Sequence, residues 1–283
     1  MFVDLKNTAC FGVAGNFTGH LEQAGEAVDF TNIKTAEANA PKAVFPTYIP
    51  NVKQKGVIPE FLETFPFDEY RIDFPKGEQK LQIEPELAIV CRASYQGGKL
   101  SSLQPLAFGA ANDCSIRKEG AKKISQKKNW GRSSKGLASN LIKIDSFDEQ
   151  GILSRYRIAS YLLRAGEIYE YGEDSPVRDY SYFYQKLLGW LIEKFNGQQD
   201  EGPAENLNAY LNAASLPESI MVSVGATRYT GFGEKNFLQG ADRALVVIYP
   251  EDVYSKEEIK HRALKDNLEE DDISVLAQEI VTN

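Results

Sequence analysis

The sequence predicts a mostly β fold of the α+β class, and three observations support this prediction. Short segments of alternating or continuous apolar residues recur from about residue 71 onward, and such patterns are typical of strands. Only two stretches show clear helical features. The 283 residues, 42% of them hydrophobic, are enough for one large domain with a sizeable core, with or without a small companion.

Three regions are expected along the chain. Residues 1–70 are predicted to form a loop-rich N-terminal segment, because proline and asparagine interrupt their short apolar runs. Residues 71–250 carry the strand patterns and are expected to form the main β body. Residues 251–283 are expected to be a helical C-terminal extension, in which residues 269–272 flank a last short helix.

Strand signals run through the main body. The period-2 pattern of residues 80–90 places four apolar residues on one face, namely Leu81, Ile83, Leu87 and Ile89. Three further segments are a hairpin at 162–174 that turns at Ala165-Gly166, a strand within 220–233 that enters a glycine-rich loop, and a buried strand at 243–250.

Two helices are predicted. In the first, apolar residues recur at every fourth position, and Asn196-Gly197 ends the helix; these residues are Phe183, Leu187, Leu191 and Phe195. In the second, Ser255 and Glu258 form a capping box, a common signal for a helix N-terminus.

Composition excludes several function classes. The net charge of −8 argues against nonspecific nucleic-acid binding, which needs a basic face. The basic stretch 117–135 is either a solvated loop or a site for a small anionic molecule. The three cysteines have unrelated spacings, and no signal peptide or membrane-spanning apolar run is recognised. We therefore expect a cytoplasmic protein without nucleic-acid or membrane partners.

Three carboxylates are candidate metal ligands. Glu84 and Glu86 are two residues apart on a predicted strand, so they point the same way. Pro85 is also compatible with an exposed edge strand, where the pair would face solvent. Asp113 lies among small residues, where a lone carboxylate is unfavourable. With no histidine nearby and no paired cysteines, the set favours Mg²⁺ or Mn²⁺, with Ca²⁺ as a further option.

These residues resemble the motifs of the fumarylacetoacetate hydrolase superfamily. Its E-x-E motif corresponds to Glu84-Pro85-Glu86, its aspartate motif to residues 112–117, and its W-x(n)-K motif to Trp130 and Lys135. Residues 224–233 resemble its glycine-rich loop. The resemblance implies a β-roll within residues 71–250 with a few peripheral helices. It also implies a metal held by Glu84, Glu86 and Asp113, and a homodimer.

The resemblance extends to a catalytic lid near the N-terminus. The segment AGNFTGHLEQ keeps Asn16 and His20 at the family spacing but has Gly15 and Gln23 in place of arginine and glutamate. Glu22 is one position away from the family glutamate. Glu26 cannot orient His20 if the segment is helical, because residues i and i+6 lie on different faces.

The resemblance implies roles for six residues. The implied catalytic residues are His20, Lys135 and Glu22, and the implied contacts to a small anionic substrate come from Asn16, Arg117 and Thr227. The favoured activity is a metal-dependent hydrolase or decarboxylase that cleaves a C–C bond of a small oxo-acid, such as an acylpyruvate, through a metal-stabilised enolate. The alternatives are a hydratase or isomerase, or a ligand-binding protein without turnover, which the altered lid and Ala226-Thr227 would explain.

Overall fold

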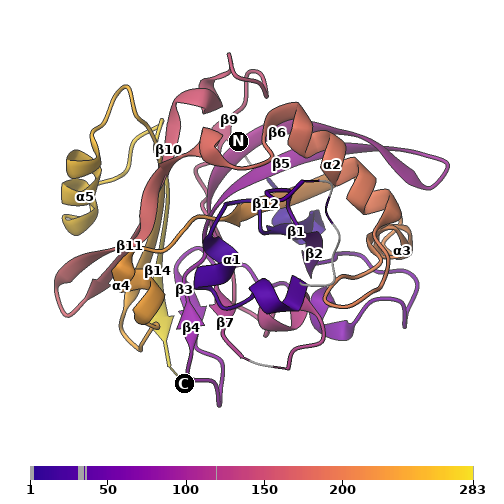
Figure 1. Ribbon diagram of the computed structural model, residues 1–283, viewed down its shortest axis with the longest axis horizontal. Helices are drawn as coiled ribbons and strands as arrows, with labels where there is room; N and C mark the ends of the chain where they lie inside the picture. The colour runs from indigo at the N-terminus through magenta and orange to yellow at the C-terminus, as the bar shows by residue number, and fades with distance from the viewer. Residues whose placement is uncertain (1–2, 31–34, 36, 119, 283) are drawn as a thin grey trace.

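The fold is mostly β, as the sequence predicts. The computed structural model describes residues 3–30, 35, 37–118 and 120–282, which contain fourteen strands and five α-helices. Most strands belong to two sheets that lie beside each other (Figure 1). The main core lies between them, because Ile89 and Phe108 of one sheet share a continuous apolar cluster with Ile158 and Val246 of the other.

The larger sheet has seven strands in the order β2-β1-β12-β5-β6-β8, with β9 also paired to β6. β1 is parallel to β12, and the other ladders are antiparallel. The strands are β1 (Ala9–Ala14), β2 (Ala43–Tyr48), β5 (Pro85–Gln96), β6 (Lys99–Asn112), β8 (Gly136–Leu137), β9 (Ile142–Lys143) and β12 (Ser219–Ala226).

The smaller sheet has the order β11-β10-β13-β14-β3, and β4 and β7 form a separate short pair. These strands are β3 (Arg71–Asp73), β4 (Leu81–Gln82), β7 (Ser115–Ile116), β10 (Tyr156–Arg164), β11 (Glu167–Pro176), β13 (Arg243–Pro250) and β14 (Ser274–Val281).

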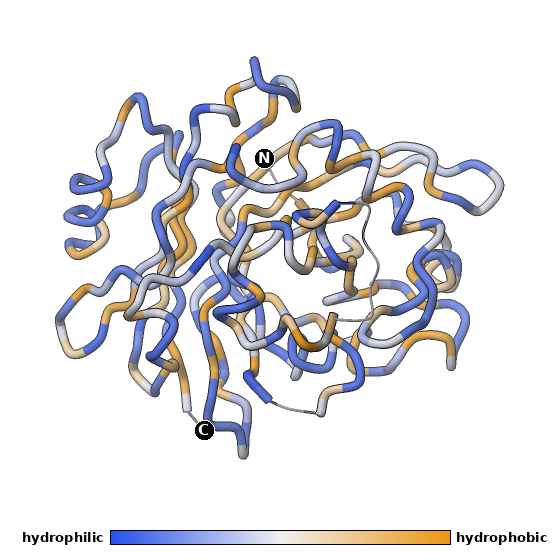
Figure 2. Tube along the Cα trace, in the orientation of Figure 1, coloured by the Kyte–Doolittle hydropathy of each residue, from blue (hydrophilic) through white to orange (hydrophobic). Residues whose placement is uncertain are grey.

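Helices pack against both sheets. α2 (Tyr184–Gly197) packs on the larger sheet beside α3 (Leu207–Ala213), and Phe195 of α2 contacts Phe11 at a ring distance of 4.7 Å. α5 (Lys256–Leu264) covers the smaller sheet, with mostly hydrophilic residues along its length (Figure 2). The short helices α1 (His20–Gln23) and α4 (Gly231–Lys235) lie near the candidate site. No helix in the described residues is long and apolar enough to cross a membrane.

Several local predictions are confirmed. The hairpin β10–β11 turns at Ala165 and Gly166, whose positive φ angles of 52° and 85° suit a tight turn. The strand predicted at 243–250 is β13 and is almost entirely buried. Ser255 caps α5 by accepting a hydrogen bond from the Glu258 backbone N–H at 3.1 Å.

Two regional predictions are wrong. Residues 1–70 do not lie outside the β body, because β1 and β2 are paired members of the larger sheet. The last short helix is instead strand β14, which pairs with β13 and β3 and buries alternate side chains. The edge-strand interpretation also fails, since β5 lies between β12 and β6. Pro85 is tolerated there because it begins the strand.

Candidate metal centre and active site

Three carboxylates converge where β5 and β6 meet. Glu84 and Glu86 flank Pro85 at the start of β5, and Asp113 directly follows β6. The Asp113 backbone N–H donates to the Glu84 carbonyl oxygen at 3.0 Å, which fixes the register of the two segments. One oxygen from each carboxylate lies within 4.8 Å of the others, and the three residues are at most 3% exposed. We call these residues the acidic group.

Three cations surround the acidic group. Lys128 Nζ lies 2.5 Å from Glu84 Oε2 and 2.8 Å from Asp113 Oδ2. Lys135 Nζ lies 3.1 Å from Asp113 Oδ1 and also donates to the Cys114 carbonyl oxygen. Arg117 Nη2 lies 2.7 Å from Glu84 Oε1. The basic stretch is therefore not simply a solvated loop, and Lys128 lies at the site together with the lysine that the sequence singles out.

The two glutamates of the acidic group differ in protonation. Burial raises the pKa of Glu86 well above its usual value, and nearby Asp113 raises it further. Burial also acts to raise the pKa of Glu84, but Lys128 and Arg117 outweigh it, so that the pKa of Glu84 is lowered. Glu84 is therefore more readily ionised than a free glutamate, whereas Glu86 loses its proton less readily and has to do so to bind a metal.

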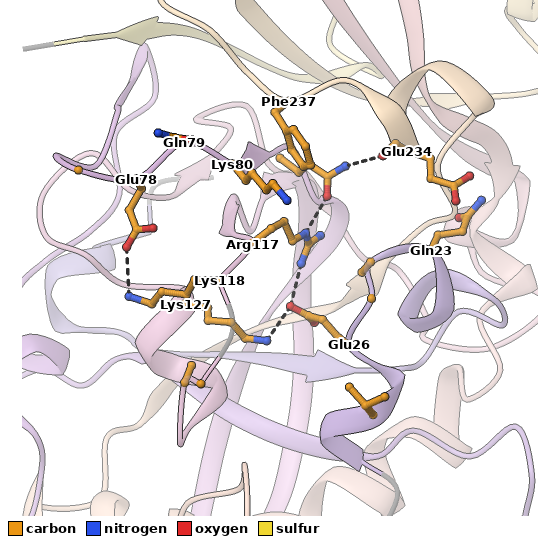
Figure 3. Close-up of a pocket in the computed structure, with 17 residues that line it drawn as sticks. Gln23, Glu26, Glu78, Gln79, Lys80, Arg117, Lys118, Lys127, Glu234 and Phe237 are labelled. Carbon is orange, nitrogen blue, oxygen red and sulfur yellow. Dashed lines mark hydrogen bonds and ion pairs between the residues drawn. The ribbon is translucent and has the colours of Figure 1, made fainter.

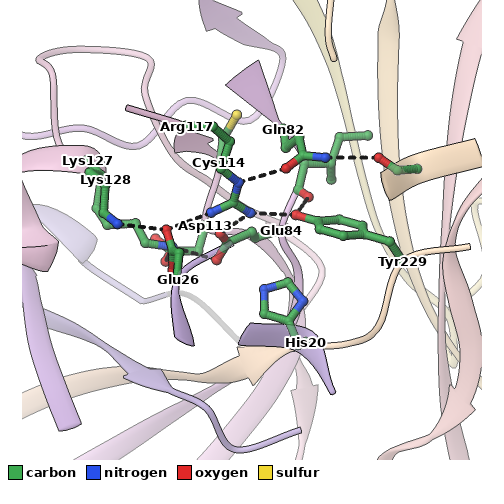
Figure 4. A network of polar contacts seen from close by, with 12 residues as sticks. His20, Glu26, Gln82, Glu84, Asp113, Cys114, Arg117, Lys127, Lys128 and Tyr229 are labelled. Carbon is green, nitrogen blue, oxygen red and sulfur yellow. Dashed lines mark hydrogen bonds and ion pairs between the residues drawn. The ribbon is translucent and has the colours of Figure 1, made fainter. Parts of the chain in front are cut away.

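Arg117 is the centre of a polar network (Figure 4). Its guanidinium donates to Gln82 Oε1, Glu26 Oε1 and Tyr229 Oη at 2.7, 2.8 and 2.7 Å. Burial opposes its charge, but Tyr229, Glu84 and Glu26 outweigh burial and raise the pKa of Arg117. The guanidinium therefore holds Glu84 in place from outside the acidic group.

His20 lies in the same site with one ring nitrogen available. Its Nδ1 is 2.8 Å from the Thr227 carbonyl oxygen, and its ring centroid is 5.1 Å from that of Tyr229. Its Nε2 is buried and has no hydrogen-bond partner among the described residues. Burial lowers the pKa of His20. A carbonyl oxygen only accepts hydrogen bonds, so Nδ1 carries the proton and Nε2 keeps a lone pair.

The lid segment places Glu26, and not Glu22, at the site. Glu22 is exposed on α1, whereas Glu26 is 7% exposed and contacts Arg117. Helix α1 ends at Gln23, and Gly25 has a φ of +70°, so the chain turns back before Glu26. Glu26 pairs with Arg117 and Lys127, and His20 is held by Thr227, so Glu26 does not orient His20, as expected, although the chain between them is not one continuous helix. Gln23 pairs with the backbone N–H and carbonyl oxygen of Tyr229 at 2.8 and 3.1 Å.

Asn16 and Thr227 position backbone segments around the site. The Asn16 side-chain amide donates to the carbonyl oxygens of Val224 and Tyr182 and accepts from the Tyr182 N–H, all within 2.9 Å. Thr227 is 1% exposed and offers its carbonyl oxygen to His20. Their substrate contacts, like those of Arg117, stay predictions.

A pocket of about 870 Å³ lies outside the network (Figure 3). Glu26, Arg117 and Lys127 line it and are joined by ion pairs of 2.8 and 3.0 Å to Glu26. Lys80 and Phe237 also line the pocket. Since Arg117 contacts Glu84 as well, it separates the pocket from the acidic group.

The acidic group fits a hard divalent ion. Its donors are carboxylate oxygens, which Mg²⁺, Mn²⁺ and Ca²⁺ prefer. Glu84 Oε1 and Asp113 Oδ2 lie 2.7 and 2.8 Å from cationic nitrogens but accept no hydrogen bond from the described residues. Buried carboxylate oxygens normally accept one. Each of these oxygens has a second lone pair besides the one that faces its cation, so the group could hold a metal ion.

Four residues of this site are not indicated by the sequence. Lys128 looks like any other lysine of a basic stretch, and Gln82 and Tyr229 carry no motif. Glu26 follows Gly25, and this glycine was the one available signal that the helix ends early.

Sequence comparison assigns the chain to a family. Residues 26–280 match the model of a "Family of unknown function (DUF5718)". The chain belongs to this family. The matched range includes the acidic group, Arg117 and Lys128, whereas His20 precedes it. No curated protein is significantly similar in sequence.

Structural comparison identifies solved proteins that are similar in fold but low in sequence identity. A hexagonal crystal form of 2-keto-3-deoxyarabinonate dehydratase has a TM-score of 0.57 at 14% identity, covering 97% of this chain and 74% of that chain. The 2-keto-3-deoxy-D-arabinonate dehydratase complexed with magnesium and 2,5-dioxopentanoate has a TM-score of 0.54 at 14% identity, covering 97% of this chain and 73% of that chain. The 2-hydroxyhepta-2,4-diene-1,7-dioate isomerase from Mycobacterium marinum has a TM-score of 0.51 at 12% identity, covering 98% of this chain and 75% of that chain. These similarities confirm the β-roll fold expected from the motifs.

Proposed function

We propose that this chain is a metal-dependent enzyme that acts on a small anionic oxo-acid at the carbon next to its keto group. The observation that carries the proposal is the buried acidic group beside a histidine with an unpartnered Nε2. Mg²⁺ or Mn²⁺ is the proposed ion, with Ca²⁺ as the alternative, because the donors are all carboxylate oxygens. When bound, the ion would stabilise negative charge on the keto oxygen.

His20 is the proposed base. The Thr227 carbonyl oxygen holds the imidazole so that the Nε2 lone pair is free. Because burial lowers the pKa of His20, the ring is unprotonated at neutral pH and able to accept a proton from carbon or from water.

Lys135 and Arg117 are the proposed contacts for the substrate's negative charge. Lys135 lies directly beside Asp113, and Arg117 lies between the acidic group and the large pocket. Substrate would enter through this pocket, whose lining includes Lys80 and Lys127. Fixed cations at such a site orient an anion and stabilise charge that develops during reaction.

Two reaction types follow from the same activated carbon. The first is cleavage of a C–C bond by hydrolysis or decarboxylation, which the motifs favour. The second is proton transfer without cleavage, as in a dehydratase or isomerase. One observation favours the second type. A backbone carbonyl oxygen orients His20, and Glu22 is exposed, so His20 lacks the carboxylate partner that would make it a stronger base toward water. The dehydratase and isomerase among the structural neighbours are in line with this reading.

Proton exchange next to the keto group tests the proposal for both reaction types. The Mn²⁺-loaded chain would be incubated in D₂O with an acylpyruvate, oxaloacetate and a 2-oxo-3-deoxy sugar acid, and followed by NMR. We expect deuterium incorporation at the carbon next to the keto group of at least one compound, and its loss in His20→Ala. Cleavage products would identify the first reaction type, and water loss or a shifted double bond the second.

Binding of an oxo-acid without exchange would instead indicate a ligand-binding protein and refute the enzyme proposal. Lys135→Met should reduce turnover but leave the chain able to bind metal, since all three carboxylates of the acidic group remain. The expected homodimer is a separate prediction, which light scattering of the purified chain tests.

A further inference from the structure

Lys128 is buried between two members of the acidic group. It follows the short 3-10 helix η4 (Ile124–Lys127), which carries it into the site. Its side chain is 3% exposed, and its Nζ is 2.5 Å from Glu84 Oε2 and 2.8 Å from Asp113 Oδ2. The centroid of the Phe45 ring lies 5.2 Å from Nζ. The ammonium group is thus held where positive charge is shared by two candidate metal ligands.

We infer that Lys128 is a built-in counter-cation of the metal site, which balances Glu84 and Asp113 in the metal-free protein and competes with a divalent ion for them. This inference rests on the metal dependence of the proposed function and adds a residue that controls metal affinity. The lysine and the ion need the same carboxylates. Both positive charges would also lie within a few ångströms of each other, where little water is present to screen them.

The charges of the site support this competition. Its buried carboxylates belong to Glu26, Glu84, Glu86 and Asp113, and its buried cations to Arg117, Lys127, Lys128 and Lys135. Even when every group is ionised, these carboxylates do not outnumber these cations. A divalent ion therefore adds positive charge to a site that is already balanced, unless Lys128 moves away from the acidic group.

The neighbouring lysine provides a matched control. Lys127 has a side chain that is 6% exposed and forms an ion pair with Glu26 at 3.0 Å. Lys127→Met removes the same charge one position earlier in the chain without removing the ammonium group between Glu84 and Asp113. A general effect of lowering the positive charge would appear in both variants, whereas competition for the acidic group would appear in Lys128→Met alone.

Calorimetric titration of the chelator-treated full chain with MnCl₂ tests the inference. We expect Lys128→Met to bind Mn²⁺ at least about tenfold tighter than the wild type, a difference of ~1.4 kcal/mol, and Lys127→Met to bind within about threefold of it. Unchanged or weaker binding by Lys128→Met, or an equal gain in Lys127→Met, would overturn the inference.

Lys128→Met leaves two carboxylates without their lysine and can be unfolded without metal. In that case recovery of native circular dichroism on addition of MnCl₂, but not of NaCl at equal ionic strength, supports the inference, and failure to recover overturns it. The proposed function fails separately. Tighter Mn²⁺ binding with no exchange on any oxo-acid would refute the enzyme and leave the competition intact. Mn²⁺-dependent exchange, together with an unchanged Mn²⁺ affinity of Lys128→Met, would refute the competition and leave the proposed enzyme function intact.

Discussion

Replacing Arg117 by methionine is expected to destabilise the protein strongly, because the guanidinium joins two buried carboxylates. It lies 2.8 Å from Glu26 and 2.7 Å from Glu84, whose side chains are 9% and 4% exposed. Removing one partner of a buried ion pair typically costs ~3–5 kcal/mol, because a charge is left uncompensated. Each carboxylate keeps one lysine, Lys127 at 3.0 Å and Lys128 at 2.5 Å. We therefore expect the lower end, about 3 kcal/mol.

Urea unfolding in the presence of a chelator, followed by fluorescence and circular dichroism, measures this loss. Arg155→Met is the control, because the ion pair of Arg155 with Asp252 is exposed, with side chains 44% and 52% accessible. Exposed pairs contribute about 0–1 kcal/mol. If Arg117→Met loses no more free energy of unfolding than Arg155→Met, the account of the buried network is wrong.

The same variant should change the pH dependence of stability. Burial acts to raise the pKa values of Glu26 and Glu84, but Arg117 and the lysines outweigh it and lower both. The stability that comes from their ionised forms is therefore present above the unfolded glutamate pKa of ~4.3 and is lost as the pH falls below it. Arg117→Met should show a shallower loss between about pH 4.3 and 2.5, and an unchanged slope would contradict this.

Three further predictions concern metal, catalysis and helix stability. Mg²⁺ or Mn²⁺ should raise the melting temperature of the wild type, and EDTA should reverse the rise. Asp113→Asn should weaken this response sharply, whereas Asp252→Asn, at an exposed position, should keep it. The turnover rate should fall on the acid side only below pH ~6.5, because burial lowers the pKa of His20 and turnover needs the neutral ring. A fall with its midpoint at or above this pH would argue against His20 as the base. Gly189→Ala should raise the free energy of unfolding by ~0.5–1 kcal/mol, because Gly189 lies within α2 and an added Cβ meets no atom within 4 Å. Urea unfolding that shows no gain in this free energy would count against the prediction.

The acidic group was predictable because its signal is local. Glu84 and Glu86 are two residues apart, and strand geometry alone directs both side chains to one side. The hairpin turn at Ala165-Gly166 and the N-cap at Ser255 were predictable for the same reason, since each depends on a few neighbouring residues. Order and spacing of the motifs then added Asp113 and the fold.

Other features could not be read from neighbours along the chain. Residues 274–281 alternate buried and partly exposed side chains, but their state depends on pairing with β13 and β3, which come from distant segments. The early end of α1 depends on a turn at Gly25, which brings Glu26 to Arg117 across 91 residues.

The sequence by itself determined the mostly β class, the helices α2 and α5, and which carboxylates could bind a metal. Only the tertiary structure decided which cations meet them. Lys127 and Lys128 are equivalent as letters of a basic stretch, but only Lys128 lies between Glu84 and Asp113. The physical reason is that burial and charge pairing depend on contacts from β5, β6 and η4 together. Periodicity describes one segment at a time and carries no information about such contacts.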